Sequence, residues 1–186
     1  VTVVTGDALQ VDWTLEIPGQ YKIVANIPYS ITSPLLRKIF SLEKKPSAVV
    51  LLIQKEMAER IVAPAGSGER GFLTLLVEAN ATAKIIRTVK PGSFRPSPKV
   101  DSAIIKVVPF DQTMVEKIFW PAVEAGFRHK RQTLANALAK DLNLTKIDVN
   151  EILVSASVPI LYRAQNLSFE EWVKLSSALQ LVFNQP

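Results

Sequence analysis

The residues best suited to chemistry are Asn26, Pro28 and Tyr29, in the run Asn26-Ile27-Pro28-Tyr29. They follow an apolar segment, residues 21–25, that has the composition of a short buried strand. In open α/β sheets ligands bind at the carboxyl ends of strands, so a functional site is expected here. The alternative is a strand end followed by an ordinary proline turn, because a four-residue motif is only a hypothesis.

This run is suited to holding a flat heterocycle that carries an exocyclic amine. The Asn26 carboxamide oxygen can accept one N–H, and the carbonyl of Pro28 or of its neighbour can accept the other, with the loop backbone restricted by proline's fixed φ. Tyr29 offers a ring face for stacking. Two acceptors on one amino group turn its lone pair toward an electrophile, which is what methylation of a nucleobase amine requires.

Composition limits the classes of protein to consider. The 186 residues are 48% hydrophobic, which suits one or two folded domains, and a net charge of +5 is compatible with a polyanionic partner. The absence of cysteine excludes a disulfide framework and fits a reducing compartment, so a cytoplasmic location is expected. The longest apolar run, residues 48–53, is too short for a bilayer, and no spacing of His, Asp or Glu resembles a metal site. We therefore expect neither a membrane nor a metal as a partner.

Apolar runs and helix-periodic segments alternate along the first part of the chain, which favours an α/β architecture. The expected strands are 1–4, 21–25 and 48–53, and the expected helices are 33–40, 55–62 and 72–79. Ser33 and Pro34 are typical of a helix start. Asp7 follows the first expected strand, so its carboxylate could accept a hydrogen bond from a cofactor. The alternative is an Asp that caps a turn after Gly6.

A long proline-rich connection, residues 90–101, joins two segments that alternate like strands, 82–89 and 102–108. An antiparallel pair at the sheet edge is expected there. Three prolines should hold the connection extended and stiff, and it presents Phe94, an apolar ring with no obvious core to join. Phe94 suits a second stacking face for a base, and the alternative is that it fills a domain interface.

Beyond Phe110 only helix-periodic segments follow, which predicts a small helical bundle. These segments are 115–127, 131–140, 146–155 and 168–183, the last starting with a capping box at Ser168. The predicted domains are therefore 1–110 and 111–186. Between the first two helices lies a basic cluster, which with two cations of the other domain gives the candidate phosphate contacts Arg95, Lys99, Arg128, Lys130 and Arg131. The alternative is a solvated charged face.

Two other signals are rejected. Residues 66–71 match G-x-G-x-x-G, but an expected helix rather than a strand precedes them, so a flexible loop is the better interpretation. The single histidine, His129, has no nucleophilic serine or cysteine in a recognisable setting, and a catalytic triad is not supported.

Several segments together resemble the small-subunit (16S) rRNA adenine dimethyltransferases (KsgA/RsmA type), relatives of the erythromycin-resistance methylases. The matching segments, in family order, are Gly6–Leu9, Asn26–Tyr29, Gln54–Arg60, Phe94–Ser102, Phe127–Leu138 and Arg163–Ser168. The string Phe-x-Pro-x-Pro-Lys-Val-Asp-Ser at 94–102 is the most diagnostic. The resemblance implies an α/β fold, an incomplete Rossmann-like class I methyltransferase domain followed by a small all-α domain.

The resemblance also implies an activity, which is dimethylation by S-adenosyl-L-methionine of the 6-amino groups of two adjacent adenosines in a 16S rRNA hairpin of the immature 30S subunit. Carried over, Asn26 and the Pro28 backbone hold the target amine, and Tyr29 and Phe94 sandwich the flipped base. Asp7, Ala8 and Asn26 contact the cofactor. The helical domain faces the ribosomal RNA.

Two departures from the family pattern are visible. The Gly-rich cofactor loop and the acidic residue that grips the ribose lie upstream of Asp7 in the family and have no counterpart here, so we expect an N-terminally truncated fragment that binds cofactor poorly and is inactive alone. Gln165 stands where the family usually has Glu. A non-catalytic rRNA-binding assembly factor remains an alternative. A DNA amino-methyltransferase is a weaker one, because Ile27 replaces the first proline of its (Asn/Asp)-Pro-Pro-aromatic motif.

Overall fold

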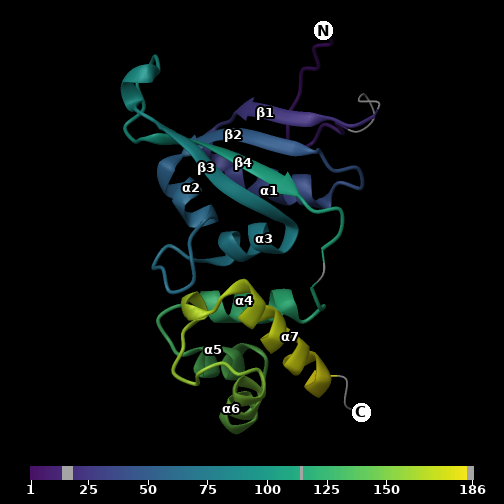
Figure 1. Cartoon of the computed structure of the whole chain (residues 1–186), viewed down its shortest axis with the longest axis vertical. Helices are drawn as coiled ribbons and strands as arrows, with labels where there is room; N and C mark the ends of the chain where they lie inside the picture. The colour runs from purple at the N-terminus through teal and green to yellow at the C-terminus, as the bar shows by residue number, and fades with distance from the viewer. Residues whose placement is uncertain (14–18, 114, 184–186) are drawn as a thin grey trace. The chain divides into compact units, whose positions relative to one another are not determined.

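The structure, a computed structural model, describes residues 1–13, 19–113 and 115–183. Its contacts divide the chain into two compact units (Figure 1). The first unit comprises Val1–Val62 and Asn80–Gln112, and the second comprises Ala63–Ala79 and Thr113–Pro186.

The first unit is built on a mixed four-stranded sheet with the order β1-β2-β4-β3. Its strands are β1 (Lys22–Asn26), β2 (Ala48–Gln54), β3 (Ala81–Val89) and β4 (Ser102–Pro109). β1 and β2 are parallel, whereas β4 is antiparallel to both of its neighbours. The expected antiparallel pair is therefore confirmed, with β3 at the edge, and so is the α/β class.

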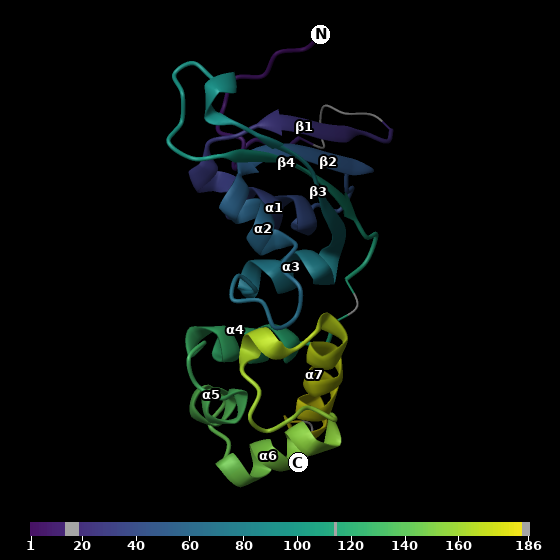
Figure 2. The ribbon, with the colours of Figure 1, turned by 60° about the vertical axis from the view of Figure 1, so that its left-hand side comes forward.

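One face of this sheet forms the core of the first unit. Alternate residues of the two central strands are fully buried, namely Val49, Leu51, Ile53, Ala103, Ile105 and Val107. Two helices, α1 (Thr32–Ser41) and α2 (Lys55–Ile61), lie on the same side of the sheet in both views (Figure 2). Burying each of the valine, leucine and isoleucine side chains contributes about 1.5–3 kcal/mol, so the packing of this face stabilises the sheet that contains β1 and β4.

The start of α1 differs by one residue from its prediction. The helix begins at Thr32, directly after a 3₁₀ turn, η1 (Tyr29–Ile31), so Ser33 lies inside the helix and is not its cap. Pro34 is in the first turn, as expected.

The prediction of a strand at residues 1–4 is wrong. The segment has no strand geometry, and Val1, Val3 and Val4 are exposed. β-branched residues favour a strand only where a neighbouring strand pairs with them and a packed layer covers them, and no described strand does so here. Asp7 consequently does not follow a strand.

The second unit is a bundle of helices. They are α3 (Phe72–Asn80), α4 (Phe119–Arg128), α5 (Leu134–Asp141), α6 (Lys146–Ser155) and α7 (Phe169–Phe183). Its core includes the fully buried Trp172 and Phe119, and Leu75 and Ala79 of α3 belong to the same cluster. Residues 63–79 thus pack with the helical bundle although the sequence places them before β3. The division at residue 110 into a catalytic and an RNA-binding domain stays a functional proposal.

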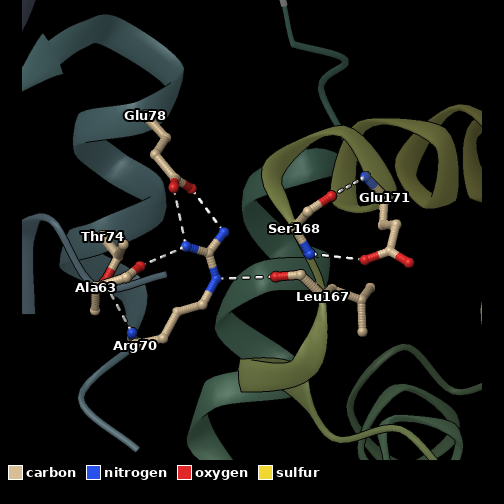
Figure 3. A network of polar contacts seen from close by, with 8 residues as sticks. Ala63, Arg70, Thr74, Glu78, Leu167, Ser168 and Glu171 are labelled. Carbon is tan, nitrogen blue, oxygen red and sulfur yellow. Dashed lines mark hydrogen bonds and ion pairs between the residues drawn. The ribbon is translucent and has the colours of Figure 1, made fainter. Parts of the chain in front are cut away.

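A buried arginine joins three segments of this second unit (Figure 3). Arg70, 1% exposed, donates to both carboxylate oxygens of Glu78 at 2.9 and 2.7 Å, and to the carbonyls of Ala63 and Leu167, both at 2.9 Å. Its guanidinium therefore links the 63–71 loop, α3 and the segment that precedes α7.

The capping box predicted at the start of α7 is confirmed (Figure 3). The Ser168 hydroxyl accepts the Glu171 N–H at 3.2 Å, and the Glu171 carboxylate accepts the Ser168 N–H at 2.7 Å. Both bonds satisfy N–H groups that have no partner inside the helix.

Candidate functional site

The run 26–29 continues directly from the carboxyl end of β1. Asn26 is the last residue of the strand and is exposed, whereas Ile27 is buried and anchors the chain to the core. The Pro28 carbonyl accepts the Ile31 N–H at 3.1 Å, and the Tyr29 carbonyl accepts the hydroxyl of the buried Thr32 at 3.1 Å. Local hydrogen bonds therefore fix this backbone, and the Pro28 oxygen keeps a second lone pair for another donor.

The loop between β3 and β4 carries the second aromatic residue. Both views show it extending beyond the sheet at the end toward which β1 points (Figures 1 and 2). It is not simply extended as expected: it contains a 3₁₀ turn, η2 (Pro91–Ser93), and a cis Arg95–Pro96 peptide. The reason is local hydrogen bonding, because the Pro91 carbonyl accepts both the Phe94 N–H at 3.1 Å and the Ser97 hydroxyl at 2.9 Å.

The two ends of this loop are held together. Lys90 and Asp101 form an ion pair at 2.8 Å, and the Asp101 carbonyl accepts the Lys55 N–H at the start of α2 at 3.0 Å. Lys90 is largely exposed, so the pair contributes little energy by itself. The pairing of Val89 with Ser102 across β3 and β4 fixes the separation of the loop ends and with it the placement of Phe94.

A pocket of about 740 Å³ brings the two predicted aromatic residues to the same site. Its lining residues all belong to the first unit: Asn26, Ile27, Pro28, Tyr29, Phe94, Pro96 and Pro98. The volume is in the range of small-molecule sites, and the lining is mostly apolar with one carboxamide among the side chains. Such a pocket suits a flat, partly apolar ring with hydrogen-bond donors at one edge.

The predicted cofactor residues Asp7 and Ala8 lie in a turn and are not among the residues that line this pocket. The Asp7 carboxylate accepts the Leu9 N–H at 2.8 Å, which is the capping arrangement weighed above. Lys38 of α1 donates to the Ala8 carbonyl at 3.0 Å and to the Val11 carbonyl, so the turn is fastened to the first unit. Asp7 and Ala8 are both exposed.

The predicted phosphate contacts differ in their surroundings. Arg95 and Lys99 are exposed on the loop of the first unit. In the second unit Arg128 donates to Asp141 at 2.8 Å and Lys130 donates to the Gly68 carbonyl at 2.7 Å, whereas Arg131 is exposed.

Asp141 is the acidic centre of the basic cluster, and no local sequence pattern predicts this role because Asp141 lies on the following helix, α5. Its carboxylate binds Arg128 and also the His129 ring at 2.9 Å. The hydrogen bond from His129, followed by the positive charges of His129 and Arg128, holds the pKa of Asp141 below its ordinary value of 3.8. Part of the cluster's positive charge is therefore paired with Asp141 within the second unit.

This pKa shift predicts a pH-dependent contribution of Asp141 to stability. A carboxyl whose pKa is lowered in the folded state stabilises the fold above its ordinary value of 3.8 and loses that contribution as pH falls through the folded value. Asp141→Asn should therefore melt below the wild type from pH 7 to pH 5, and the difference should shrink below about pH 4. Thermal melting across this range measures it, with Glu124→Gln, on the exposed face of α4, as the control for one lost charge. A difference that is constant down to pH 2.5 would contradict the assignment.

Two further properties bear on the classes of function. Among the described residues, no group of three or more His, Cys, Asp or Glu side chains is arranged to hold a metal ion. None of the helices in the described ranges has the length and apolar character needed to cross a membrane.

Comparison with known proteins gives consistent matches. The family model described as "Ribosomal RNA adenine dimethylase" matches residues 1–181. The chain is 42% identical over 167 residues to the ribosomal RNA small subunit methyltransferase A of Dehalococcoides mccartyi (strain CBDB1), covering 86% of this chain and 57% of the relative. It is 37% identical over 184 residues to the protein of the same name from Clostridium botulinum (strain Kyoto / Type A2), covering 96% of this chain and 66% of the relative. The chain thus spans 57–66% of the length of these curated relatives.

Solved structures match the fold. A dimethyladenosine transferase from Plasmodium falciparum superposes with a TM-score of 0.78 at 27% identity, over 97% of this chain and 71% of that one. The 23S rRNA methyltransferase ErmE superposes with a TM-score of 0.71 at 22% identity, over 95% of this chain and 71% of that one. The second likeness concerns the fold alone.

Proposed function

Because the chain belongs to the ribosomal RNA adenine dimethylase family, we propose that it forms the base-binding and RNA-binding part of an S-adenosyl-L-methionine-dependent rRNA adenine dimethyltransferase. The observation that carries this proposal is the pocket at the end of β1, lined by Asn26, Pro28, Tyr29 and Phe94. A carboxamide, a backbone carbonyl and two aromatic rings are the groups needed to hold an adenine by its 6-amino group and its faces.

Each of these groups has a defined part. The Asn26 carboxamide oxygen and the Pro28 carbonyl accept the two N–H groups of the target amine, so the nitrogen lone pair points away from the ring plane. Tyr29 and Phe94 stack on the two faces of the base, and each such contact is worth about 1–3 kcal/mol in single-strand recognition. The base must leave its stack to reach the pocket, which the two rings favour. Orientation of the amine is the main contribution of these residues to the rate.

The cofactor residues fit one end of S-adenosyl-L-methionine. The exposed Asp7 carboxylate is an acceptor suited to the adenine amine of the cofactor, and the backbone of Ala8 is fixed beside it through Lys38. Asn26 is the third residue that we assign to the cofactor. The cofactor supplies a methyl group that its sulfonium already activates, so these residues need no strong base. Their part is to bind the cofactor and to orient it.

The substrate proposed is 16S rRNA in the immature 30S subunit, with two adjacent adenosines of a hairpin loop as the methyl acceptors. The relatives that match over most of this chain are named as small subunit methyltransferases, which supports this choice. The cations proposed for phosphate contacts include the exposed Arg95, Lys99 and Arg131. Arg128 and Lys130 add positive charge beside Arg131.

The test of this function is methyl transfer by the complete gene product that contains these residues. Immature small subunits and duplex DNA are offered in separate reactions with labelled S-adenosyl-L-methionine, and modified nucleosides are identified by mass spectrometry. Dimethyladenosine in the small-subunit rRNA is expected. Methylated DNA would favour a DNA amino-methyltransferase, and binding without any transfer would favour an RNA-binding assembly factor. Calorimetry with S-adenosyl-L-methionine measures the cofactor affinity of the 186-residue chain directly.

A further inference from the structure

The phenol of Tyr29 is held by a buried serine of another strand. The Tyr29 hydroxyl and the Ser102 hydroxyl lie 2.8 Å apart, and either can be the donor. Ser102 is 0% exposed, and it is the first residue of β4, paired with Gln54 of β2 on one side and Val89 of β3 on the other. It is therefore fixed by the sheet itself.

Stacking on a base requires only the ring face of Tyr29, so the hydroxyl bond must be explained separately. Tyr29 belongs to a three-residue 3₁₀ turn between the exposed Pro28 and the start of α1, and its ring is only partly buried. A ring in this position can rotate about its side-chain torsions unless its hydroxyl group is held by a hydrogen bond. A hydrogen bond from the para position restricts that swing while leaving the face of the ring accessible.

Ser102 also marks the point at which the Phe94 loop rejoins the sheet. The preceding residue, Asp101, binds Lys90 at the other end of the loop and the Lys55 N–H of α2. The hydroxyl bond therefore connects Tyr29 to the base of the loop that carries Phe94, and both rings line the same pocket.

We propose that Ser102 is a positioning residue that holds the Tyr29 ring relative to the Phe94 loop and so sets the width and tilt of the slot for the target base. This inference rests on the proposed function, because it takes Tyr29 and Phe94 as the stacking faces. Ser102 itself touches neither the base nor the cofactor. It acts through Tyr29, and its effect should appear in the turnover step, where the amine must be aligned, more than in the affinity for RNA.

The test is a double-variant cycle of Ser102→Ala and Tyr29→Phe in the complete gene product. Each single variant should lower kcat about fivefold to tenfold, as expected for one neutral hydrogen bond, and change the KM for rRNA by less than about twofold. The double variant should be no slower than either single one, since both remove the same bond. Ser176→Ala, which removes another buried hydroxyl (1% exposed) in the second unit, is the matched control and should leave kcat unchanged.

A binding readout independent of turnover complements the cycle. An rRNA hairpin with 2-aminopurine at the target adenosine reports stacking by its fluorescence, and Ser102→Ala and Tyr29→Phe should alter this signal equally. Melting temperatures check that both variants fold. Effects on kcat that add up in the double variant, or a wild-type kcat in Ser102→Ala, would overturn the inference and leave the proposed function intact. A wild-type protein that neither transfers methyl groups nor perturbs the 2-aminopurine would overturn both.

Discussion

Asn26→Ala is expected to lower the rate of methyl transfer by the complete protein about 10²–10³-fold and to leave rRNA affinity within about twofold of the wild type. The reason is that the Asn26 carboxamide is the one polar side chain among the residues that line the pocket apart from the Tyr29 phenol, which Ser102 engages. Without it the target amine keeps one acceptor and its lone pair stays in conjugation with the ring. Losing one preorganised polar group at a reaction centre typically costs about 10²–10³ in kcat.

Single-turnover kinetics and filter binding on the same preparations measure the two quantities separately. The RNA affinity should persist because the phosphate contacts that we propose come from exposed cations outside the pocket, which this variant leaves unchanged. Asn26→Asp is the matched control, since it keeps an oxygen acceptor at the same position and should retain more activity than the alanine variant. Turnover at the wild-type rate in Asn26→Ala would remove Asn26 from the mechanism.

Much of the site follows from local patterns that a sequence displays. The run 26–29 is recognisable because an apolar segment ends at an amide, a proline and an aromatic residue, and the structure places it at the end of β1 as expected. Phe94 is recognisable because an aromatic ring on a proline-rich loop has no evident core to join, and it lines the pocket. Both inferences depend on the periodicity of strands and on turn chemistry, which are short-range properties.

Contacts between distant residues were not predictable in this way. The bond between Tyr29 and Ser102 joins residues 73 positions apart, and Ser102 carried no signal beyond its place at the end of the diagnostic string. Arg70 lies in a glycine-rich segment whose composition predicts a flexible loop, yet it is almost fully buried and reaches the Leu167 carbonyl, 97 positions away. The prediction of a strand at residues 1–4 is wrong because it considers composition alone. A strand also needs a partner strand, which the local sequence does not reveal.

Glu78→Ala is expected to destabilise the second unit by about 3 kcal/mol, the largest loss of stability that we predict and the low end of the range for breaking a buried ion pair, because the Glu78 side chain is 33% exposed. It would remove the carboxylate that accepts two hydrogen bonds from the buried guanidinium of Arg70, while the bonds from that guanidinium to the carbonyls of Ala63 and Leu167 remain. Those two bonds hold Arg70 in place, so it cannot reach solvent without breaking them. Urea denaturation followed by tryptophan fluorescence measures the effect, because Trp120 and Trp172 lie in the same unit as Arg70.

The matched control is Glu56→Ala, which breaks an ion pair of similar length on α2, 2.9 Å from Arg60, with both side chains exposed. It should cost at most about 1 kcal/mol, because solvent screens such pairs. Replacing both partners of the buried pair, by Arg70→Met with Glu78→Leu, should recover only part of the loss, since the two carbonyls then lack donors at about 1 kcal/mol or more each. Equal costs for Glu78→Ala and Glu56→Ala would show that the buried pair is hydrated, and the central place assigned to Arg70 in the bundle would be wrong.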